Sequence, residues 1–175
     1  MTADILSAHL PGDRVRPLLE AAEAADGIAA FSEAFVQGLD DERVRHTHLI
    51  VEDSGEVIAC AGIAEDGSAE LVVHPQRRRE GVGEALAKAV REQRPDAGLW
   101  ARGNLAGAQA LAGKLGLTVD RELLVMGIAA EEIPAGGAEL PEGFEALDYA
   151  GAVERWGRDA VDRQWLEVNN DAFSW

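Results

Sequence analysis

The sequence predicts an α/β domain of the α+β type, in which a mixed, mostly antiparallel sheet is flanked by helices. Two observations support this fold class. Three short apolar runs, LIV, VIACAGI and AELVV, follow one another closely and are separated by the turn-forming stretches EDSGE and EDGS. After them, two stretches with apolar residues at helical spacing alternate with two further short apolar runs. The expected order is helix, three strands, helix, strand, helix, strand.

The first helical region covers residues 14–38. Its apolar residues recur at helical spacing on both sides of Gly27, which interrupts the pattern, so the region is either two helices or one kinked helix. The three strands that follow, within residues 46–74, are joined by short turns that favour an antiparallel meander, and Pro75 ends the last of them. Cys60 lies inside the middle strand and is predicted to be a buried core thiol rather than a nucleophile.

A further helix is predicted at residues 82–93, followed by a short strand in AGLWARG. The apolar face of that helix consists of Val82, Leu86, Ala89 and Val90. The last helix covers residues 104–117 and is expected to end at Gly116. Its predicted inward face consists of Leu105, Ala108, Leu111, Ala112 and Leu115. The run RELLVMGIA, residues 121–129, is predicted to be the final strand.

Composition divides the chain into three segments. Residues 1–130 hold the elements above and form the predicted domain. Residues 131–143, EEIPAGGAELPEG, are rich in proline and glycine and are predicted to be a linker. Residues 144–175 restart with a short strand-like piece and then a helix, and their NNDAF is similar to FSEAF at 31–35. This last segment is therefore either the opening of a second copy of the domain or a chance similarity.

The charge of the chain limits its partners. Acidic residues outnumber basic ones 32 to 16, and the formal net charge is −16. A field of this sign repels nucleic acid and anionic membranes, so neither is an expected partner. One cysteine permits no disulfide within the chain, and no cluster of metal-ligating residues is visible, so no metal is expected. The absence of a signal-like start or a long apolar run predicts a cytoplasmic protein.

The stretch LVVHPQRRREGVGEAL, residues 71–86, gathers three arginines and two glycines between a predicted strand and a predicted helix. Glycines allow backbone to approach a ligand closely, and the first amides of a helix have no internal acceptors, so this turn is suited to hold an anion such as phosphate. Arg78 and Arg79 could add charge-assisted bonds. The alternative is a solvated arginine cluster. A nucleoside triphosphate or a dinucleotide fits poorly, because neither phosphate-binding fingerprint is present.

The hexapeptide RREGVG, residues 78–83, after a strand ending in VHP, resembles the acyl-CoA signature of the GCN5-related N-acetyltransferases, the GNAT family. A helix beginning NLAGAQAL strengthens the resemblance, which covers residues 14–128 and implies the GNAT fold with acetyl-CoA as cosubstrate. It implies that Leu71, Val72 and Val73 contact pantetheine. It places the pyrophosphate on the loop formed by Arg78, Arg79, Glu80, Gly81, Val82, Gly83 and Glu84. Asn104 would bond the pantetheine arm, or would alternatively be a helix N-cap.

Within that family, the sequence is most similar to a branch built of two tandem GNAT domains. The similarity is based on the stretches LVVHPQRRREGVGEAL, RELLVM, the linker and WLEVNNDAF. This implies acetyl transfer to the cysteine amine of a cysteinyl-glucosaminyl-inositol, with a second GNAT domain in the same chain. Glu33, in FSEAF, would be the acid of the first domain that meets this acceptor, or otherwise an ordinary exposed helix residue.

Catalytic residues are harder to identify. The family usually places a carboxylate just upstream on the coenzyme strand, where this sequence has Gly67, so Glu65, Asp66 and Glu70 are the candidate bases and His74 is a further one. The family tyrosine that protonates the leaving thiolate is replaced by alanine at position 112. The sequence therefore predicts a domain that binds acetyl-CoA and leaves catalysis to a following domain. The alternatives are a non-catalytic acyl-CoA-binding module and a stand-alone N-acetyltransferase for another small amine.

Overall fold

The computed structural model describes residues 4–133 and 139–173. The chain separates into two compact units, Met1–Glu122 and Leu123–Trp175, and each is described by itself.

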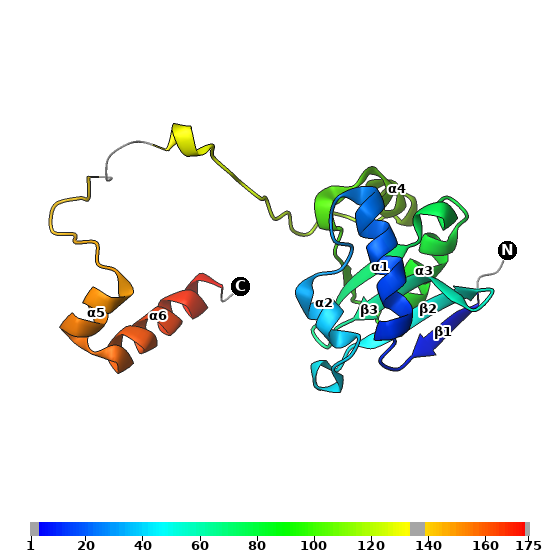
Figure 1. Ribbon diagram of the computed structural model, residues 1–175, viewed down its shortest axis with the longest axis horizontal. Coiled ribbons are helices and arrows are strands. Elements are labelled where there is room, and N and C mark those ends of the chain that lie inside the picture. The colour runs from blue at the N-terminus through cyan, green and yellow to red at the C-terminus, as the bar shows by residue number, and fades with distance from the viewer. Residues whose placement is uncertain (1–3, 134–138, 174–175) are drawn as a thin grey trace. The chain divides into compact units, whose positions relative to one another are not determined.

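The first unit is built around a five-stranded sheet (Figure 1). Its strands are β1 (Ile5–Ala8), β2 (Thr47–Asp53), β3 (Glu56–Ile63), β4 (Ser68–Val73) and β5 (Gly98–Leu99), and they lie in this order across the sheet. Strands β1 to β4 pair antiparallel with one another, and β5 is parallel to β4. The predicted mixed, mostly antiparallel sheet and its central meander are therefore confirmed. Strand β1 was not predicted from the sequence, because it is a four-residue edge strand without a clear apolar alternation.

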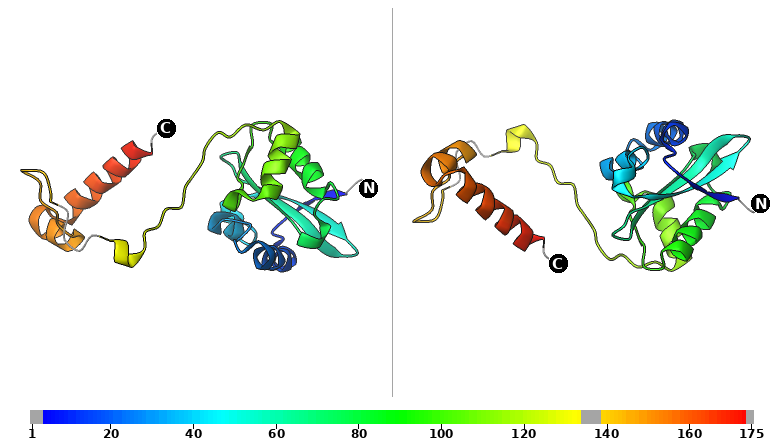
Figure 2. Two further views of the ribbon diagram at one scale, coloured as in Figure 1. Left: turned by 90° about the horizontal axis from the view of Figure 1, so that it is seen from above. Right: turned by 90° about the horizontal axis from the view of Figure 1, so that it is seen from below.

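Helices cover both faces of this sheet (Figure 2). On one face lie α1 (Gly12–Asp26) and α2 (Glu33–Gly38), and on the other lies α3 (Val82–Gln93) with α4 (Ala106–Leu115) beside it. Residues 14–38 thus form two helices rather than one kinked helix. Gly27 ends α1 with a left-handed φ of 71°, and its N–H donates to the Glu23 carbonyl at 2.8 Å.

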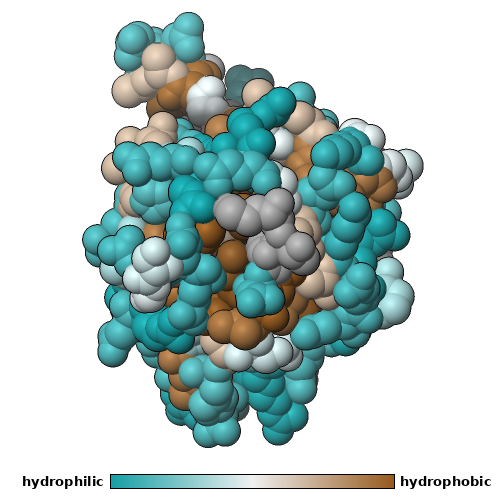
Figure 3. Space-filling model, turned by 90° about the vertical axis from the view of Figure 1, so that its right-hand side faces the viewer, coloured by the Kyte–Doolittle hydropathy of each residue, from teal (hydrophilic) through white to brown (hydrophobic). Residues whose placement is uncertain are grey.

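The core of the first unit consists of one apolar cluster on each face of the sheet. Cys60 is fully buried, and burial raises the pKa of its thiol to about 12, which confirms it as a core residue. Helix α3 begins and ends where the sequence predicted, and Val82, Leu86 and Val90 are buried as expected. Ala89 is only partly buried, and the neighbouring Ala87 is buried fully. The face presented by Figure 3 is largely hydrophilic around an apolar area, in keeping with the acidic composition.

Helix α4 ends at Gly116 as predicted, with a φ of 66°. Its predicted inward residues, however, are only partly buried. The helix therefore lies at the margin of the domain rather than over the centre of the sheet.

The strand predicted at residues 121–129 is not formed. A strand needs a neighbour for its N–H and C=O groups, and no strand in the described ranges pairs with this segment. Its apolar side chains are exposed, with Leu123 at 70 % and Val125 at 103 % of their full accessibility. The apolar run was correctly recognised, but the partner that would make it a strand is not among the described residues.

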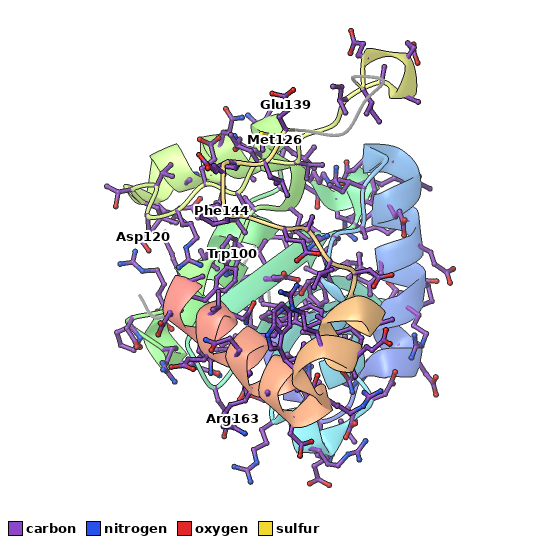
Figure 4. All side chains as sticks on the ribbon, turned by 90° about the vertical axis from the view of Figure 1, so that its left-hand side faces the viewer. Trp100, Asp120, Met126, Glu139, Phe144 and Arg163 are labelled. Atoms are coloured by element: carbon purple, nitrogen blue, oxygen red, sulfur yellow. The ribbon has the colours of Figure 1, made fainter. Side chains whose placement is uncertain are left out.

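The described residues of the second unit form two α-helices, α5 (Tyr149–Trp156) and α6 (Arg158–Ala172). They pack against each other through Tyr149 and Trp165, whose ring centroids are 5.9 Å apart, and the Tyr149 hydroxyl donates to Asp162 at 2.6 Å. Of the side chains labelled in Figure 4, Met126, Glu139, Phe144 and Arg163 belong to this unit, and the apolar Met126 and Phe144 are both exposed.

Two expectations for the second unit need correction. No strand is formed at residues 144–148, and Asp148 caps α5 by accepting the Gly151 N–H at 2.7 Å. The similarity of NNDAF to FSEAF is not matched by structure, since FSEAF begins a short helix and NNDAF ends a long one. The predicted linker is described only in part: residues 134–138 lie outside the described residues, and Ala130–Glu132 forms a short 3₁₀ turn. No described helix has both the length and the apolar character needed to cross a membrane.

Candidate functional site

The open edge of β4 is the first part of the site. Strand β4 pairs with β3 along its length, but with β5 only at Ser68 and Ala69, where the Trp100 N–H donates to the Ala69 carbonyl at 2.9 Å. Trp100, labelled in Figure 4, directly follows the last residue of β5. Because backbone groups alternate along a strand, those of Leu71 point to the same side as those of Ala69, where β5 has already ended. In the part of the chain that the structure describes, no strand occupies this edge beside Leu71.

The turn between β4 and α3 is the second part. The first helical bond of α3 runs from the Ala85 N–H to the Gly81 carbonyl at 3.0 Å. Within the described ranges, the N–H groups of residues 79–84 have no backbone acceptor. Arg79 and Gly81 both have positive φ, 69° and 87°, and a Cβ placed on Gly81 would meet nothing within 4 Å. Free amides, an open approach and the positive end of a twelve-residue helix suit an anion.

The three arginines of this turn have different surroundings. Arg77 forms ion pairs with Asp53 and Glu80. Arg78 donates two hydrogen bonds of 2.7 Å each to the carboxylate of Asp26, and its Nε donates to the Val73 carbonyl at 3.2 Å. Arg79 is exposed and has no ion pair among the described residues. The expected side-chain contact with phosphate is thus open to Arg79, whereas the Arg78 guanidinium is already engaged.

The acidic residues of the loop are also paired. Glu80 holds Arg77, and Glu84 lies between Lys88 and Lys114, which lower the pKa of its carboxyl to about 2. Their charges are therefore compensated by neighbouring cations, and the backbone amides of the same residues remain free for a ligand.

Asn104 lies in a short turn before α4, with a φ of 46°. The residue that caps α4 is Leu105, so the alternative interpretation of Asn104 as the helix N-cap is wrong. Its carbonyl accepts a bond from Gln109 at 2.8 Å, and the residue is exposed. Its side-chain amide is thus accessible, as a contact with the pantetheine arm would require.

The candidate bases differ sharply in environment. Glu65 is exposed and pairs with Arg45 at 3.4 Å. Asp66 accepts the Ser68 N–H at 2.8 Å, and the bonds from Ser68 lower its pKa. Glu70 is only 4 % exposed, and burial raises the pKa of its carboxyl. Glu70 is thus the candidate whose burial favours the protonated carboxyl, as is common for catalytic bases.

Two further positions are explained by the turns in which they lie. His74 precedes the 3₁₀ turn Pro75–Arg77, and its Nδ1 accepts the Gln76 N–H at 3.3 Å, so it caps this turn. Gly67 has a φ of 89° in the turn before β4, a conformation that an acidic side chain would adopt only under strain. The family carboxylate is therefore absent at a position where this backbone favours glycine.

Glu70 also connects β4 to the loop between α1 and α2. One of its carboxylate oxygens accepts the Ser32 N–H at 2.7 Å. Glu33, the predicted acceptor-contacting residue, follows directly as the first residue of α2 and is exposed. The fold therefore brings the backbone of Ser32, the residue directly before Glu33, to the side chain of Glu70, although the two are far apart in sequence.

Sequence reasoning missed several residues near the site. Asp26 holds Arg78 across 52 positions, and the Arg102 Nε donates to the Ala29 carbonyl at 3.2 Å across 73 positions. No local pattern could have revealed such pairs. Among the described residues, no group of three histidine, cysteine or acidic side chains could hold a metal ion.

Comparison with known proteins agrees with this geometry. Residues 44–116 match the family model described as the acetyltransferase (GNAT) domain. The chain carries a GNAT acetyltransferase domain. The matched residues contain β4, the turn between β4 and α3, and all of α3 and α4.

Similar curated proteins are longer than this chain. A mycothiol acetyltransferase of Corynebacterium kroppenstedtii is 37 % identical over 186 residues, covering 92 % of this chain and 52 % of the relative. One from Corynebacterium aurimucosum is 42 % identical over 166 residues, covering 93 % and 53 %. The chain thus spans about half the length of the curated relatives it matches.

A solved structure shows the same fold as the GNAT domain. A predicted acetyltransferase of Clostridium acetobutylicum, crystallised with acetyl-CoA, has a TM-score of 0.51 at 13 % identity, and the match covers 71 % of this chain and 95 % of that one. The expected GNAT fold is therefore confirmed.

Proposed function

We propose that this chain is the coenzyme-binding first domain of an acetyl-CoA-dependent N-acetyltransferase of the mycothiol acetyltransferase type. The acceptor would be the cysteine amine of a cysteinyl-glucosaminyl-inositol. The observation that carries the coenzyme assignment is the run of free amides at residues 79–84 beside the open edge of β4. The mycothiol acetyltransferases that match over more than nine-tenths of the chain support the acceptor. The expected cytoplasmic location remains a prediction.

In the proposed complex, the pyrophosphate of coenzyme A lies against the amides of residues 79–84, with Arg79 beside it. The pantetheine arm pairs with the β4 edge at Leu71–Val73, as an added strand would, and Asn104 contacts it from the other side. The thioester then lies near Ala69, where β5 closes the edge.

Acetyl transfer requires that the acceptor amine attack the thioester carbonyl carbon and lose a proton, while the C–S bond breaks and the sulfur gains one. The Leu71 N–H is the proposed donor to the developing oxyanion. Glu70 is the proposed base and would act through water, because its side chain is nearly buried. Glu33 would meet the acceptor.

A second candidate is a non-catalytic acyl-CoA-binding domain. Ala112 stands where the family places the tyrosine that protonates the thiolate, and Gly67 stands where a carboxylate is expected. These two positions favour a domain that binds acetyl-CoA and depends on a second GNAT domain for the reaction. A stand-alone enzyme for another small amine would depend on Glu70 alone.

Calorimetric titration with acetyl-CoA, together with an acetylation assay on cysteinyl-glucosaminyl-inositol, tests these proposals. We expect the chain to bind acetyl-CoA whether it is a catalytic or a non-catalytic domain. Binding with turnover that disappears in Glu70→Gln supports catalysis within this chain, and binding without turnover supports the non-catalytic domain. If the chain does not bind acetyl-CoA, the proposed function is wrong.

A further inference from the structure

The pair formed by Arg78 and Asp26 is more elaborate than a surface ion pair. Both terminal nitrogens of Arg78 bond to the two carboxylate oxygens of Asp26 at 2.7 Å, and the third nitrogen bonds to the Val73 carbonyl at 3.2 Å. The Asp26 side chain is only 15 % exposed, and the bond from Arg78 lowers the pKa of its carboxyl. Such a planar, bidentate guanidinium–carboxylate pair fixes the relative positions of its two residues more firmly than a single contact between exposed charges.

The pair connects the end of helix α1 to the turn between β4 and α3, which has few backbone hydrogen bonds of its own. Asp26 is the last residue of α1, which is anchored in the core by Val15, Leu18 and Ala22. Among the described residues, the turn on the other side has two backbone bonds of its own before α3, from the Arg77 and Arg78 N–H groups. Without side-chain anchors, the course of this turn would be weakly determined.

The residue after Arg78 shows why an anchor is needed. Arg79 is not glycine, yet it has a left-handed φ of 69°, and its N–H is the first of the free amides. Residues hold such conformations when the surrounding structure imposes them. Arg78 is fastened at once to the end of α1 and to the end of β4, and it therefore fixes the backbone from which the amides of residues 79–84 project.

We infer that Arg78 and Asp26 are a positioning pair for the phosphate-binding turn, and that Arg78 is not itself a phosphate ligand. The inference rests on the proposed coenzyme site. It assigns to Asp26, a residue outside the motif, the role of holding the turn in its anion-binding form.

The direction in which Asp26→Asn changes coenzyme A affinity distinguishes a positioning role of Arg78 from direct contact with phosphate. Asp26→Asn removes a negative charge near the site and releases the Arg78 guanidinium. If Arg78 were available to bind phosphate, this change would strengthen coenzyme A binding or leave it unchanged. If the pair positions the turn, Asp26→Asn weakens coenzyme A binding about tenfold despite the more favourable charge, since amide bonds to phosphate depend on geometry.

The probe also distinguishes this role from a general loss of structure. S-acetylpantetheine lacks the pyrophosphate and would use only the β4 edge, so we expect its affinity, measured by NMR titration, to be the same in Asp26→Asn and the unchanged chain. Asp53→Asn is the matched control, because it removes one carboxylate partner from the neighbouring Arg77 and should leave both affinities unchanged. Equal losses for coenzyme A and S-acetylpantetheine in Asp26→Asn would overturn the inference.

Arg78→Lys keeps the positive charge but cannot form the bidentate pair with Asp26. It tests the positioning role if Asp26→Asn fails to fold. We expect it to weaken coenzyme A about tenfold as well, and we expect Asp26→Ala with Arg78→Ala to be no worse than either single change. Additive losses, or an unchanged affinity in Arg78→Lys, contradict the pairing. If the unchanged chain does not bind coenzyme A, the proposed function fails, and this inference fails with it.

Discussion

Gly81 is the residue whose lack of a side chain matters most to the proposed coenzyme site. It is the N-cap residue directly before α3 and has a φ of 87°, and the space where its Cβ would lie is open. A valine there strains the backbone by about 1–2 kcal/mol and places methyl groups where phosphate would approach the amides. We expect Gly81→Val to weaken coenzyme A by about 1–3 kcal/mol in calorimetric titration.

Gly55 provides a matched control for that measurement. It has nearly the same φ, 88°, and equally open space, but it lies in the turn between β2 and β3. Gly55→Val should lower the free energy of unfolding as Gly81→Val does and leave coenzyme A binding unchanged. Equal affinities in the two variants would place the pyrophosphate elsewhere.

His48 links the stability of the domain to pH. It is 2 % exposed, its Nε2 has no partner in the described structure, and burial, with His46 and His9 nearby, lowers its pKa to about 4. An unfolded histidine has a pKa near 6.5, so the stabilisation by the neutral form is complete above that value and is lost as the pH falls toward 4. The loss is up to about 3 kcal/mol, at 1.36 kcal/mol per pKa unit.

We expect His48→Leu to remove this component. The difference in free energy of unfolding between the variant and the unchanged chain, from urea titrations at pH 4 to 7.5, should grow in favour of leucine as the pH falls. Contributions from other groups, including the raised pKa of Glu70, are common to both proteins and cancel in the difference. A difference that does not vary with pH would show that His48 does not titrate as a buried group.

At the scale of elements, the sequence predicted best where periodicity and turn signals agreed. Strands β2 to β4 and helix α3 lie where the apolar runs, the EDSGE and EDGS turns and the helical stripe placed them. The turn between β4 and α3 could be predicted for the same reason, since its glycines and helix start are local, and its binding of an anion stays a prediction. The strand expected at residues 121–129 failed because pairing depends on a neighbour that no local pattern reveals. The same limit hid the engagement of Arg78 by Asp26.

The packing of α2 on the sheet gives an element-scale prediction. A Cβ on Gly38, the last residue of α2, would lie 2.1 Å from Nδ1 of His46, whose ring is held against Phe35 at 4.6 Å between centroids. We expect Gly38→Ala to destabilise the domain by about 1–3 kcal/mol, because the helix or the ring must move.

Gly113, in α4, is the matched comparison, because its Cβ would meet nothing within 4 Å. Gly113→Ala should stabilise the domain by about 0.5–1 kcal/mol through helix propensity alone. Glycine to alanine is thus expected to lower the free energy of unfolding in α2 and to raise it in α4, and urea titration of the two variants measures both changes. A stabilising Gly38→Ala would mean that α2 is not tightly seated on His46.

At the scale of the whole molecule, the unequal apolar exposure of the two units is the main feature. The first unit encloses both core clusters, whereas exposed apolar side chains are numerous from Leu123 onward, among them Val125, Met126, Trp156 and Trp165. Exposed apolar surface of this kind is typical of segments that are covered by another part of a protein. It agrees with the proposal that a second GNAT domain belongs with this one, as does the length of the curated relatives.

Two truncated chains, residues 1–122 and residues 1–130, test where the first domain ends. The structure places the boundary of the first unit at Glu122, and the sequence predicted residue 130. Because both core clusters and the turn proposed to bind phosphate lie before Glu122, we expect both truncated chains to unfold at the same temperature and to bind coenzyme A within about twofold of the full chain. Lower thermal stability in residues 1–122 alone would show that residues 123–130 complete the domain, as the sequence predicted. Weaker coenzyme A binding by both truncated chains would instead mean that the second unit contributes to the site.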